Sequence, residues 1–263
     1  MPTSAPSHIP QTPPALVPAA RLRRMRAPLS GGAATTLHVT SYDRVAFRAR
    51  VVALDRPASL ARWCQAGGVA HAVVGGFVVR PHCAPLGEVR IDGTARPSEP
   101  FAAPWHRARA CLHLLDGEAT IARRHRLEPE PAGDLLQAGP LLVAHGRRVV
   151  RDGDDAEGFA AAAHQFDSDI TRGRYPRAAL GIAGQRLVAV ACDGRTDRDA
   201  GMTLAELADA LVGLGVTDAL NLDGGGSASL VHDGRLRNRP REEHGVDLIE
   251  GRPVVTAIAI ERR

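Results

Sequence analysis

An aspartate followed by three glycines and a serine is the part of this sequence best suited to chemistry. The apolar run of residues 219–222 includes Asn221 and stops at Asp223, and it is followed by Gly224, Gly225, Gly226 and Ser227. Glycines let backbone N–H groups approach a ligand with no side chain in the way, and they accept positive φ. Successive N–H groups of this kind form concave anion sites. We therefore predict that this loop binds an anion such as a phosphate; a flexible turn is the alternative interpretation.

A second carboxylate follows an earlier apolar run. Residues 185–192 have the pattern of a buried strand that ends at Asp193. Between the two aspartates, the capping box formed by Thr203 and Glu206 begins a helix that ends near residue 213. A strand-helix-strand unit normally joins parallel neighbours, so we expect Asp193 and Asp223 at the same edge of one sheet. If another strand lies between them, the two carboxylates stand about 10 Å apart.

Four blocks in the C-terminal half occur in the order found in one known family. They are residues 174–182 (RYPRAALGI), 193–195 (DGR), 201–208 (GMTLAELA) and 221–227 (NLDGGGS). In these blocks the sequence resembles the phosphodiester glycosidases. Weaker similarity in residues 74–78 (VGGFV), 85–93 and 139–146 extends the resemblance over most of residues 70–260.

The resemblance implies hydrolysis of the bond between an anomeric carbon and a phosphate oxygen, which releases a free sugar and a phosphomonoester. Because phosphate is already a good leaving group, the larger needs are to stabilise an oxocarbenium-like transition state and to aim a water at the anomeric carbon. One carboxylate can do this, and we predict Asp223 or Asp193 as the general base or charge stabiliser. The predicted substrate-binding residues are Asn221, Gly224, Gly225, Gly226, Ser227, Arg177, Arg195, Gly75, Gly76 and Phe77.

Arg177 and Arg195 are the predicted cationic partners of the phosphate, because a guanidinium binds phosphate in a bidentate manner. For each of them a solvated surface charge is the alternative. The chemistry requires no cofactor. The sequence has no Cys-x-x-Cys or His-Glu-x-x-His motif that would indicate a metal site, although a divalent cation at Asp193 or Asp223 is left open.

Two positions depart from the family pattern. Val74 stands where the family usually carries asparagine, and Ala178 stands where it carries threonine. If the missing amide and hydroxyl contact the substrate in relatives, then substrate choice has shifted or activity has been lost. The alternative function is therefore a catalytically silent protein that binds a phosphorylated or nucleotide-linked sugar. A serine hydrolase is disfavoured, because Ser229 stands where a nucleophile elbow at Ser227 needs glycine.

The composition argues against larger partners. Aromatic residues make up 3% of the chain, which limits base stacking on nucleic acid, and the net charge is only +4. All 33 basic residues are arginine, which indicates the codon bias of a GC-rich bacterial genome more than selection for a basic surface. The sequence has no apolar stretch long enough to predict a membrane span, and none that predicts an export signal. We expect a cytoplasmic protein that acts on a small-molecule sugar phosphodiester, and the oligomeric state is not predicted.

The remaining pattern predicts the elements that must position the glycine loop. Residues 1–34 are predicted to be a disordered Pro- and Arg-rich tail, and residues 35–263 to form one catalytic domain. Strands are expected at 45–51, 69–79 and 254–260, a short helix over 57–66, and hairpins over 141–150 and 229–236. Strands outnumber helices, so we predict an α+β fold with a mixed central β-sheet, flanking helices and one strand-helix-strand unit that carries the site.

Overall fold

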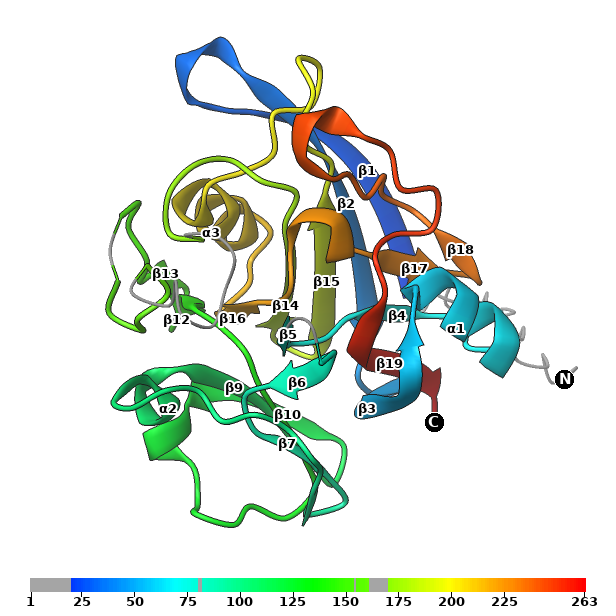
Figure 1. The fold of residues 1–263 in the computed structure, drawn as a ribbon, viewed down its shortest axis with the longest axis vertical. Helices are drawn as coiled ribbons and strands as arrows, with labels where there is room; N and C mark the ends of the chain where they lie inside the picture. Colours follow the sequence, from blue (N-terminus) through cyan, green and yellow to red (C-terminus); the bar gives the residue numbers. More distant parts are fainter. Residues whose placement is uncertain (1–19, 80–81, 154, 161–169) are drawn as a thin grey trace, which may run out of the picture.

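The protein is built mostly from antiparallel β-sheets. The computed structural model describes residues 20–79, 82–153, 155–160 and 170–263, shown in Figure 1. Within these residues the α-helices are α1 (Leu60–Gly67), α2 (Trp105–Ala108) and α3 (Leu204–Gly213), all short. The prediction of a mixed central sheet with flanking helices is therefore wrong.

The largest sheet has seven strands and contains the predicted strand-helix-strand unit. In spatial order they are β1 (Ala20–Pro28), β2 (Ala34–Asp43), β15 (Arg186–Cys192), β14 (Ala178–Ala183), β16 (Asp218–Asn221), β12 (Leu141–Ala144) and β13 (Arg147–Arg148). β14 pairs antiparallel with both β15 and β16. The two strands joined by α3 thus run parallel but are separated by β14, which the sequence analysis did not identify as a strand. This insertion makes the sheet antiparallel instead of mixed.

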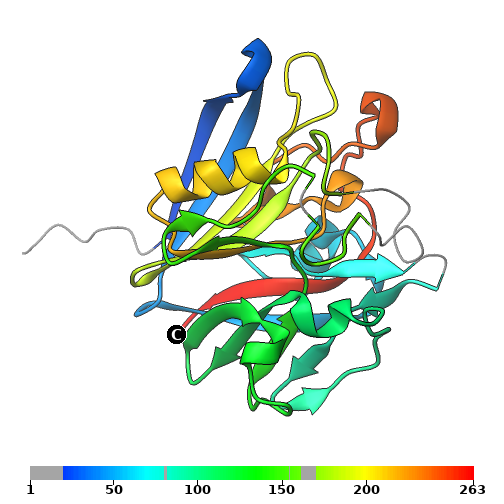
Figure 2. The same ribbon diagram turned by 90° about the vertical axis from the view of Figure 1, so that its left-hand side faces the viewer.

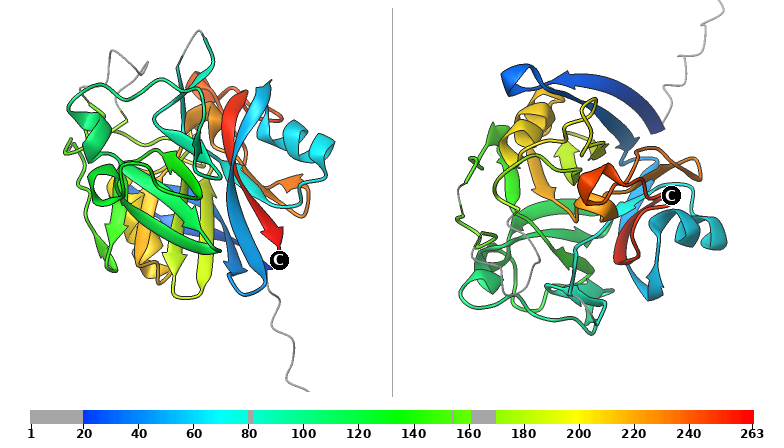
Figure 3. Two further views of the ribbon diagram at one scale, coloured as in Figure 1. Left: turned by 90° about the horizontal axis from the view of Figure 1, so that it is seen from below. Right: turned by 45° about the horizontal axis from the view of Figure 1, so that its top comes forward.

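Two further sheets have five strands each, and a small one has two. One five-stranded sheet is ordered β10 (Glu118–Arg123), β9 (Ala110–Leu115), β11 (Asp134–Gln137), β7 (Val89–Ile91) and β8 (Thr94–Ala95). The other is ordered β18 (Arg235–Leu236), β17 (Leu230–His232), β4 (Ala72–Val74), β19 (Val254–Arg262) and β3 (Phe47–Ala58). β5 (Phe77–Val79) pairs with β6 (Ala84–Leu86). In the views of Figures 1 and 3, α1 lies on the outer side of the second five-stranded sheet.

Several predicted local elements are confirmed. The hairpins at residues 141–150 and 229–236 are β12–β13 and β17–β18, and the closing strand is β19. The predicted short helix is α1, which Ser59 caps by accepting a hydrogen bond from the N–H of Arg62. None of the described helices has the length and apolar character needed to cross a membrane.

The N-terminal segment of the described chain is an edge strand and not part of a tail. β1 pairs with β2 over its whole length, from Ala20 opposite Tyr42 to Pro28 opposite Ala34. Arg26 donates a hydrogen bond to the carboxylate of Asp199, which ties this strand to the loop after β15. The predicted disorder of residues 20–34 is therefore wrong, because an Arg-rich composition is compatible with a half-exposed edge strand. Residues 1–19 lie outside the described part of the chain. The pair of strands β1 and β2 is visible in Figure 3.

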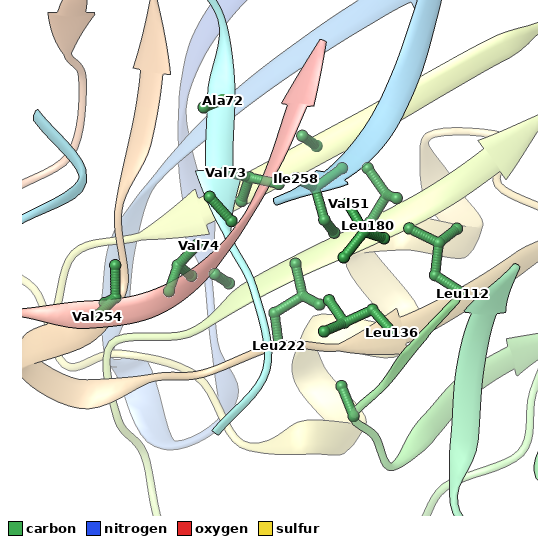
Figure 4. Close-up of a cluster of buried hydrophobic side chains, with 14 of the residues drawn as sticks. Val51, Ala72, Val73, Val74, Leu112, Leu136, Leu180, Leu222, Val254 and Ile258 are labelled. Carbon is green, nitrogen blue, oxygen red and sulfur yellow. The ribbon is translucent and has the colours of Figure 1, made fainter. Parts of the chain in front are cut away.

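The main hydrophobic core lies where the three large sheets meet. Figure 4 shows side chains from all three: Val73 and Ile258 from the β17–β4–β19 sheet, Leu112 and Leu136 from β9 and β11, and Leu180 and Leu222 from β14 and the end of β16. All of these are almost completely buried. Since protein interiors are close-packed, this shared core fixes the strand ends of the three sheets relative to one another.

Helix α3 covers the outer face of the seven-stranded sheet (Figure 2). Its apolar stripe of Leu204, Leu207 and Leu211 packs in a second cluster with Val143 and Val190 of the sheet. The predicted capping box is present, since the Thr203 hydroxyl accepts from the N–H of Glu206 and the Glu206 carboxylate accepts from the N–H of Thr203. The helix thereby braces the strands that lead to both aspartates.

Glu206 gives the fold a predictable dependence on acid. Burial alone would raise the pKa of Glu206, but hydrogen bonds from Arg174 and from the N–H of Thr203 outweigh it and lower the pKa to about 2. A lowered pKa contributes stability above pH 4.5 that is lost as the pH falls toward 2. We expect Glu206→Gln to lower the free energy of unfolding at pH 7 by roughly 1 to 2 kcal/mol and to remove this part of its acid dependence. Urea unfolding at pH 7, 4 and 3 measures the difference.

The matched control is Glu243→Gln, which changes an exposed carboxylate in the 3-10 turn Glu243–Gly245. Its stability difference from wild type should be small and similar at each pH. If wild type and Glu206→Gln lose stability in parallel between pH 7 and pH 3, the ion pair with Arg174 does not stabilise the fold.

Candidate active site

The two predicted catalytic aspartates lie at the same edge of the seven-stranded sheet. β15 and β16 end at this edge and β14 begins there (Figure 1). Pro176, just before β14, lies between the two loops. A Cβ on Gly194 would stand 2.8 Å from the nitrogen of Pro176, and a Cβ on Gly224 would stand 2.9 Å from its carbonyl oxygen. The shared edge is therefore confirmed, whereas direct adjacency of the two strands is not.

Hydrogen bonds from its backbone N–H groups hold the loop that begins at Asp223. The N–H of Asp223 donates to the carbonyl of Gly75 (3.0 Å), and the N–H of Gly224 donates to Asp223 Oδ1 (2.9 Å). Gly225 has a φ of +59°, which favours glycine, and its N–H donates to the carbonyl of Pro176 (2.8 Å). The following turn is the 3-10 helix Gly225–Ser227. These hydrogen bonds set the direction of the loop before any ligand arrives.

The predicted anion site therefore offers fewer backbone donors than the three glycine N–H groups of the loop. Gly224 and Gly225 donate to oxygens of the protein itself, whereas the N–H of Gly226 has no hydrogen-bond partner among the residues that the structure describes. Ser227 is 2% exposed and its N–H donates to the carbonyl of Gly224. The buried N–H of Gly226 is thus the donor of this loop that remains to donate to a ligand oxygen.

Three charged side chains, those of Arg195, Glu242 and Arg252, lie near Gly225 and Gly226. A guanidinium nitrogen of Arg195 would stand 3.5 Å from a Cβ on Gly225, and Glu242 Oε1 would stand 2.9 Å from a Cβ on Gly226. Glu242 accepts a hydrogen bond from Arg252 Nε (2.6 Å) and lies 3.7 Å from Arg195 Nη1. Two arginines and one glutamate thus lie beside the loop, and the Asp223 carboxylate balances their net charge.

Asp193 is more deeply buried than Asp223. Its side chain is 4% exposed, one carboxylate oxygen accepts from the N–H of Arg239 (2.6 Å), and the other lies 3.3 Å from His38 Nε2. Asp223 is half-buried. Both oxygens of Asp193 therefore have partners inside the protein. Asp223 is therefore the more accessible of the two carboxylates, and Asp193 helps to hold the edge of the sheet.

Arg177 lies beneath the site instead of facing out of it. The residue is 2% exposed, and its guanidinium donates to the carbonyls of Met202, Ile170 and Gly173. Its backbone N–H lies 3.3 Å from the thiol sulfur of Cys192, whose pKa burial raises to about 12. Arg177 thus organises the segment before β14, and Arg195 is the predicted arginine that borders the glycine loop.

Asn221 and Phe77, two other predicted binding residues, make their contacts inside the protein. Asn221 is 1% exposed and its amide donates to the carbonyls of Gly139 and Leu222. Phe77 packs against Phe159, with ring centroids 5.5 Å apart, inside the core. The structure therefore places both of these behind the loop.

Gly75 and Gly76 are the predicted binding residues that support the loop directly. The N–H of Gly75 donates to the carbonyl of Thr256, and the N–H of Gly76 donates to the Thr256 hydroxyl. A bulge in the pairing of β19 with β3 lies between Val254 and Thr256. Since Gly75 also accepts from Asp223, this backbone contact joins β19 to the candidate catalytic residue.

Some residues around the site could not be foreseen from the sequence. Glu242 and Arg252 lie in the C-terminal loops, where no motif marks them, and His38 stands in a β-strand pattern. Glu157 belongs to an acidic run that suggests a polar loop, yet it is 3% exposed and accepts from the N–H groups of Ala110 and Leu141. Their roles come from tertiary contacts over long sequence separations.

The sequence model of the phosphodiester glycosidase family matches residues 67–261. This chain belongs to that family. The matched region contains both aspartates, the glycine loop, Arg195 and Glu242. A comparison with curated proteins finds no match.

Solved structures show the same fold as this chain. The catalytic domain of zebrafish N-acetylglucosamine-1-phosphodiester alpha-N-acetylglucosaminidase, auto-inhibited by its pro-peptide, superposes with a TM-score of 0.70 at 18% identity. That match covers 95% of this chain and 85% of the zebrafish chain. A hypothetical protein from Synechocystis matches with a TM-score of 0.65 and 18% identity over 93% of this chain, which spans 62% of that protein. A protein from Burkholderia pseudomallei gives 0.63 and 16% over 89% of this chain and 75% of its own.

Proposed function

We propose that this member of the family hydrolyses the sugar-phosphate bond of a glycosyl-1-phosphodiester, and that its substrate is a small molecule of the cytoplasm. The observation that carries the proposal is the arrangement of Asp223, the Gly226 N–H and Arg195 around one rigid loop. It combines a carboxylate with a backbone donor and a guanidinium, which are the groups that a glycosyl phosphate needs. The zebrafish relative supports the choice of bond, since its name specifies a 1-phosphodiester.

In the proposed mechanism the phosphate lies against Gly226 and Arg195, and the sugar lies toward Asp223. Water attacks the anomeric carbon as the bond from that carbon to the phosphate oxygen breaks. The bonding electrons leave with the phosphate, where the N–H and the guanidinium stabilise the added charge. Asp223 stabilises the positive charge that develops on the sugar and accepts the proton of the water. Free sugar and a phosphomonoester are the products.

Arg195 provides a direct test of the phosphate position. We expect Arg195→Gln to lower kcat/KM for the phosphodiester by about 100-fold, because it removes the charge that stabilises the leaving phosphate. Gln retains a donor toward the carbonyl of Arg241, which Arg195 contacts at 2.8 Å. Steady-state kinetics and a thermal unfolding curve separate loss of catalysis from loss of structure.

Arg198→Gln is the matched control, since Arg198 is an exposed arginine three residues along the same loop. Its kcat/KM should stay within about twofold of wild type, as expected for a surface charge that is screened by salt. Equal kinetics for Arg195→Gln and wild type would remove Arg195 from the proposed mechanism.

The second candidate function is binding of a phosphorylated or nucleotide-linked sugar without turnover. It is favoured by Val74 and Ala178, two apolar residues where the family pattern carries asparagine and threonine. Both are fully buried, with Val74 in β4 and Ala178 in β14. A change at these positions alters the layer under the loop without removing Asp223 or Arg195.

A panel of sugar-1-phosphodiesters, including UDP-N-acetylglucosamine, distinguishes the two functions. The proposed hydrolase releases free sugar and phosphomonoester in equal amounts from at least one member of the panel. Calorimetric titration with the same compounds detects binding when no product forms. Tight binding across the panel without any release would favour the second candidate.

A further inference from the structure

Two histidines and an aspartate gather at the end of the second five-stranded sheet, away from the glycine loop. His71 immediately precedes β4, His232 ends β17, and Asp233 stands in the turn to β18 (Figure 1). The other ends of β4 and β17 lead to Gly75 and Ser229. Both histidines are buried, at 8% and 5% exposure, whereas the Asp233 side chain is 69% exposed. Possible ligand atoms of the three residues lie within 4.8 Å of one another.

The distances within this cluster suit a shared cation better than direct hydrogen bonds. His232 Nε2 lies 3.4 Å from Asp233 Oδ2, and His71 Nε2 lies 3.7 Å from Asp233 Oδ1. Hydrogen bonds from nitrogen to oxygen are usually about 2.7 to 3.2 Å long. Two ligands of one tetrahedral zinc ion, each about 2.1 Å from the metal, stand about 3.4 Å apart.

Tyr42 can set His232 in the form that binds a metal. Its hydroxyl lies 3.1 Å from His232 Nδ1. When Nδ1–H donates to the phenol oxygen, the lone pair of Nε2 faces Asp233. Metal-binding histidines usually donate their second N–H to such a partner.

His71 must change its tautomer to bind a metal. Its Nδ1 accepts a long 3.4 Å hydrogen bond from the N–H of Asp233, and a metal at Nε2 requires the proton to move to Nδ1. That bond is at the limit of hydrogen-bond length, so it holds the present form of the ring only weakly.

The ligand types in the cluster select the class of metal. Ca²⁺ and Mg²⁺ need several oxygen ligands, whereas this cluster offers two imidazoles and one carboxylate, so these hard cations do not fit. Arg237, which donates to the carbonyl of His232, is a nearby positive charge that opposes any divalent cation equally. Imidazole nitrogen suits zinc and its transition-metal neighbours.

We propose that His71, His232 and Asp233 form a binding site for a divalent transition metal of the zinc class. The site joins the turn after β17 to the start of β4 and leaves a coordination position toward solvent, since Asp233 is exposed. It uses no residue of the proposed active site. Its test is therefore independent of the proposed function.

Calorimetric titration of the chelator-treated full chain with Zn²⁺ tests the site, and Co²⁺ absorption reports the ligand set. We expect wild type to bind one equivalent of Zn²⁺ at this cluster and Asp233→Asn to bind it at least tenfold more weakly, since a charged ligand is lost. Asparagine also tolerates the positive φ of residue 233, which is 50°, so the turn survives. His232→Gln is a second variant, and its Co²⁺ spectrum is compared with that of wild type.

Asp116→Asn is the matched control, because Asp116 has a φ of 51° and precedes a glycine in the turn between β9 and β10. Its Zn²⁺ affinity should equal that of wild type. The proposal is overturned if wild type binds no stoichiometric Zn²⁺, or if Asp233→Asn and His232→Gln retain wild-type affinity and Co²⁺ spectrum.

Discussion

Asp223→Asn is expected to lower kcat/KM for a glycosyl-1-phosphodiester by about 10³-fold, the range in which a lost general base or charge stabiliser is usually found. Asparagine keeps an oxygen that can accept the hydrogen bond from the Gly224 N–H, so the loop should retain its shape. What is lost is the negative charge beside the anomeric carbon and the ability to accept a proton from water. Product release in steady state, with the unfolding midpoint as a check of folding, measures this effect.

Asp218→Asn is the matched control for that measurement. Asp218 stands at the opposite end of the same strand β16, where its carboxylate accepts from the N–H of His145. Its kcat/KM should remain within about threefold of wild type, because surface substitutions rarely affect a distant site. If the two variants lose activity equally, the loss comes from β16 and not from the charge at residue 223.

Gly75→Ala is expected to destabilise the protein by about 3 kcal/mol, the usual size of a severe steric clash in a core. A Cβ at residue 75 would stand 2.4 Å from the hydroxyl oxygen of Thr256 and 2.8 Å from its backbone carbon. The backbone of β19 cannot move aside without breaking its pairing with β4 and β3. Activity should fall as well, because the carbonyl of Gly75 holds the N–H of Asp223. Urea unfolding and kinetics measure the two effects.

Gly213→Ala is the matched control for Gly75→Ala. Gly213 is the last residue of α3, and a Cβ there meets nothing within 4 Å. Alanine in a helix is favoured over glycine by up to about 1 kcal/mol, so this variant should be as stable as wild type or slightly more so. A neutral Gly75→Ala would show that the contact with Thr256 is looser than the distances indicate.

Local elements of this fold could be predicted from the sequence because local rules determine them. The hairpins at residues 141–150 and 229–236, the capping box at Thr203 and a strand at residues 45–51 all agree with the structure. β14 was missed, because its small residues Ala178, Ala179 and Gly181 lack the β-branched pattern of a strand. One missed strand changed the predicted pairing of a whole sheet.

The candidate site shows the same division between local and tertiary information. The Asp223 loop is visible as a motif, whereas the burial of Arg177 and Asn221 follows from the segments that pack over them. Arg177 and Arg195 are indistinguishable by residue type, yet one donates to carbonyls inside the protein and the other borders Gly225. Glu242 enters the site from a distant loop, and no spacing rule connects it to Gly226.

The central claim is that this chain breaks the bond on the sugar side of the bridging phosphate oxygen. Hydrolysis of a glycosyl-1-phosphodiester in oxygen-18 water tests it most directly, with the phosphomonoester analysed by mass spectrometry. The account predicts an unlabelled phosphomonoester, because the water oxygen is transferred to the anomeric carbon. A phosphomonoester that carries the label would contradict it, since the water would then have attacked phosphorus.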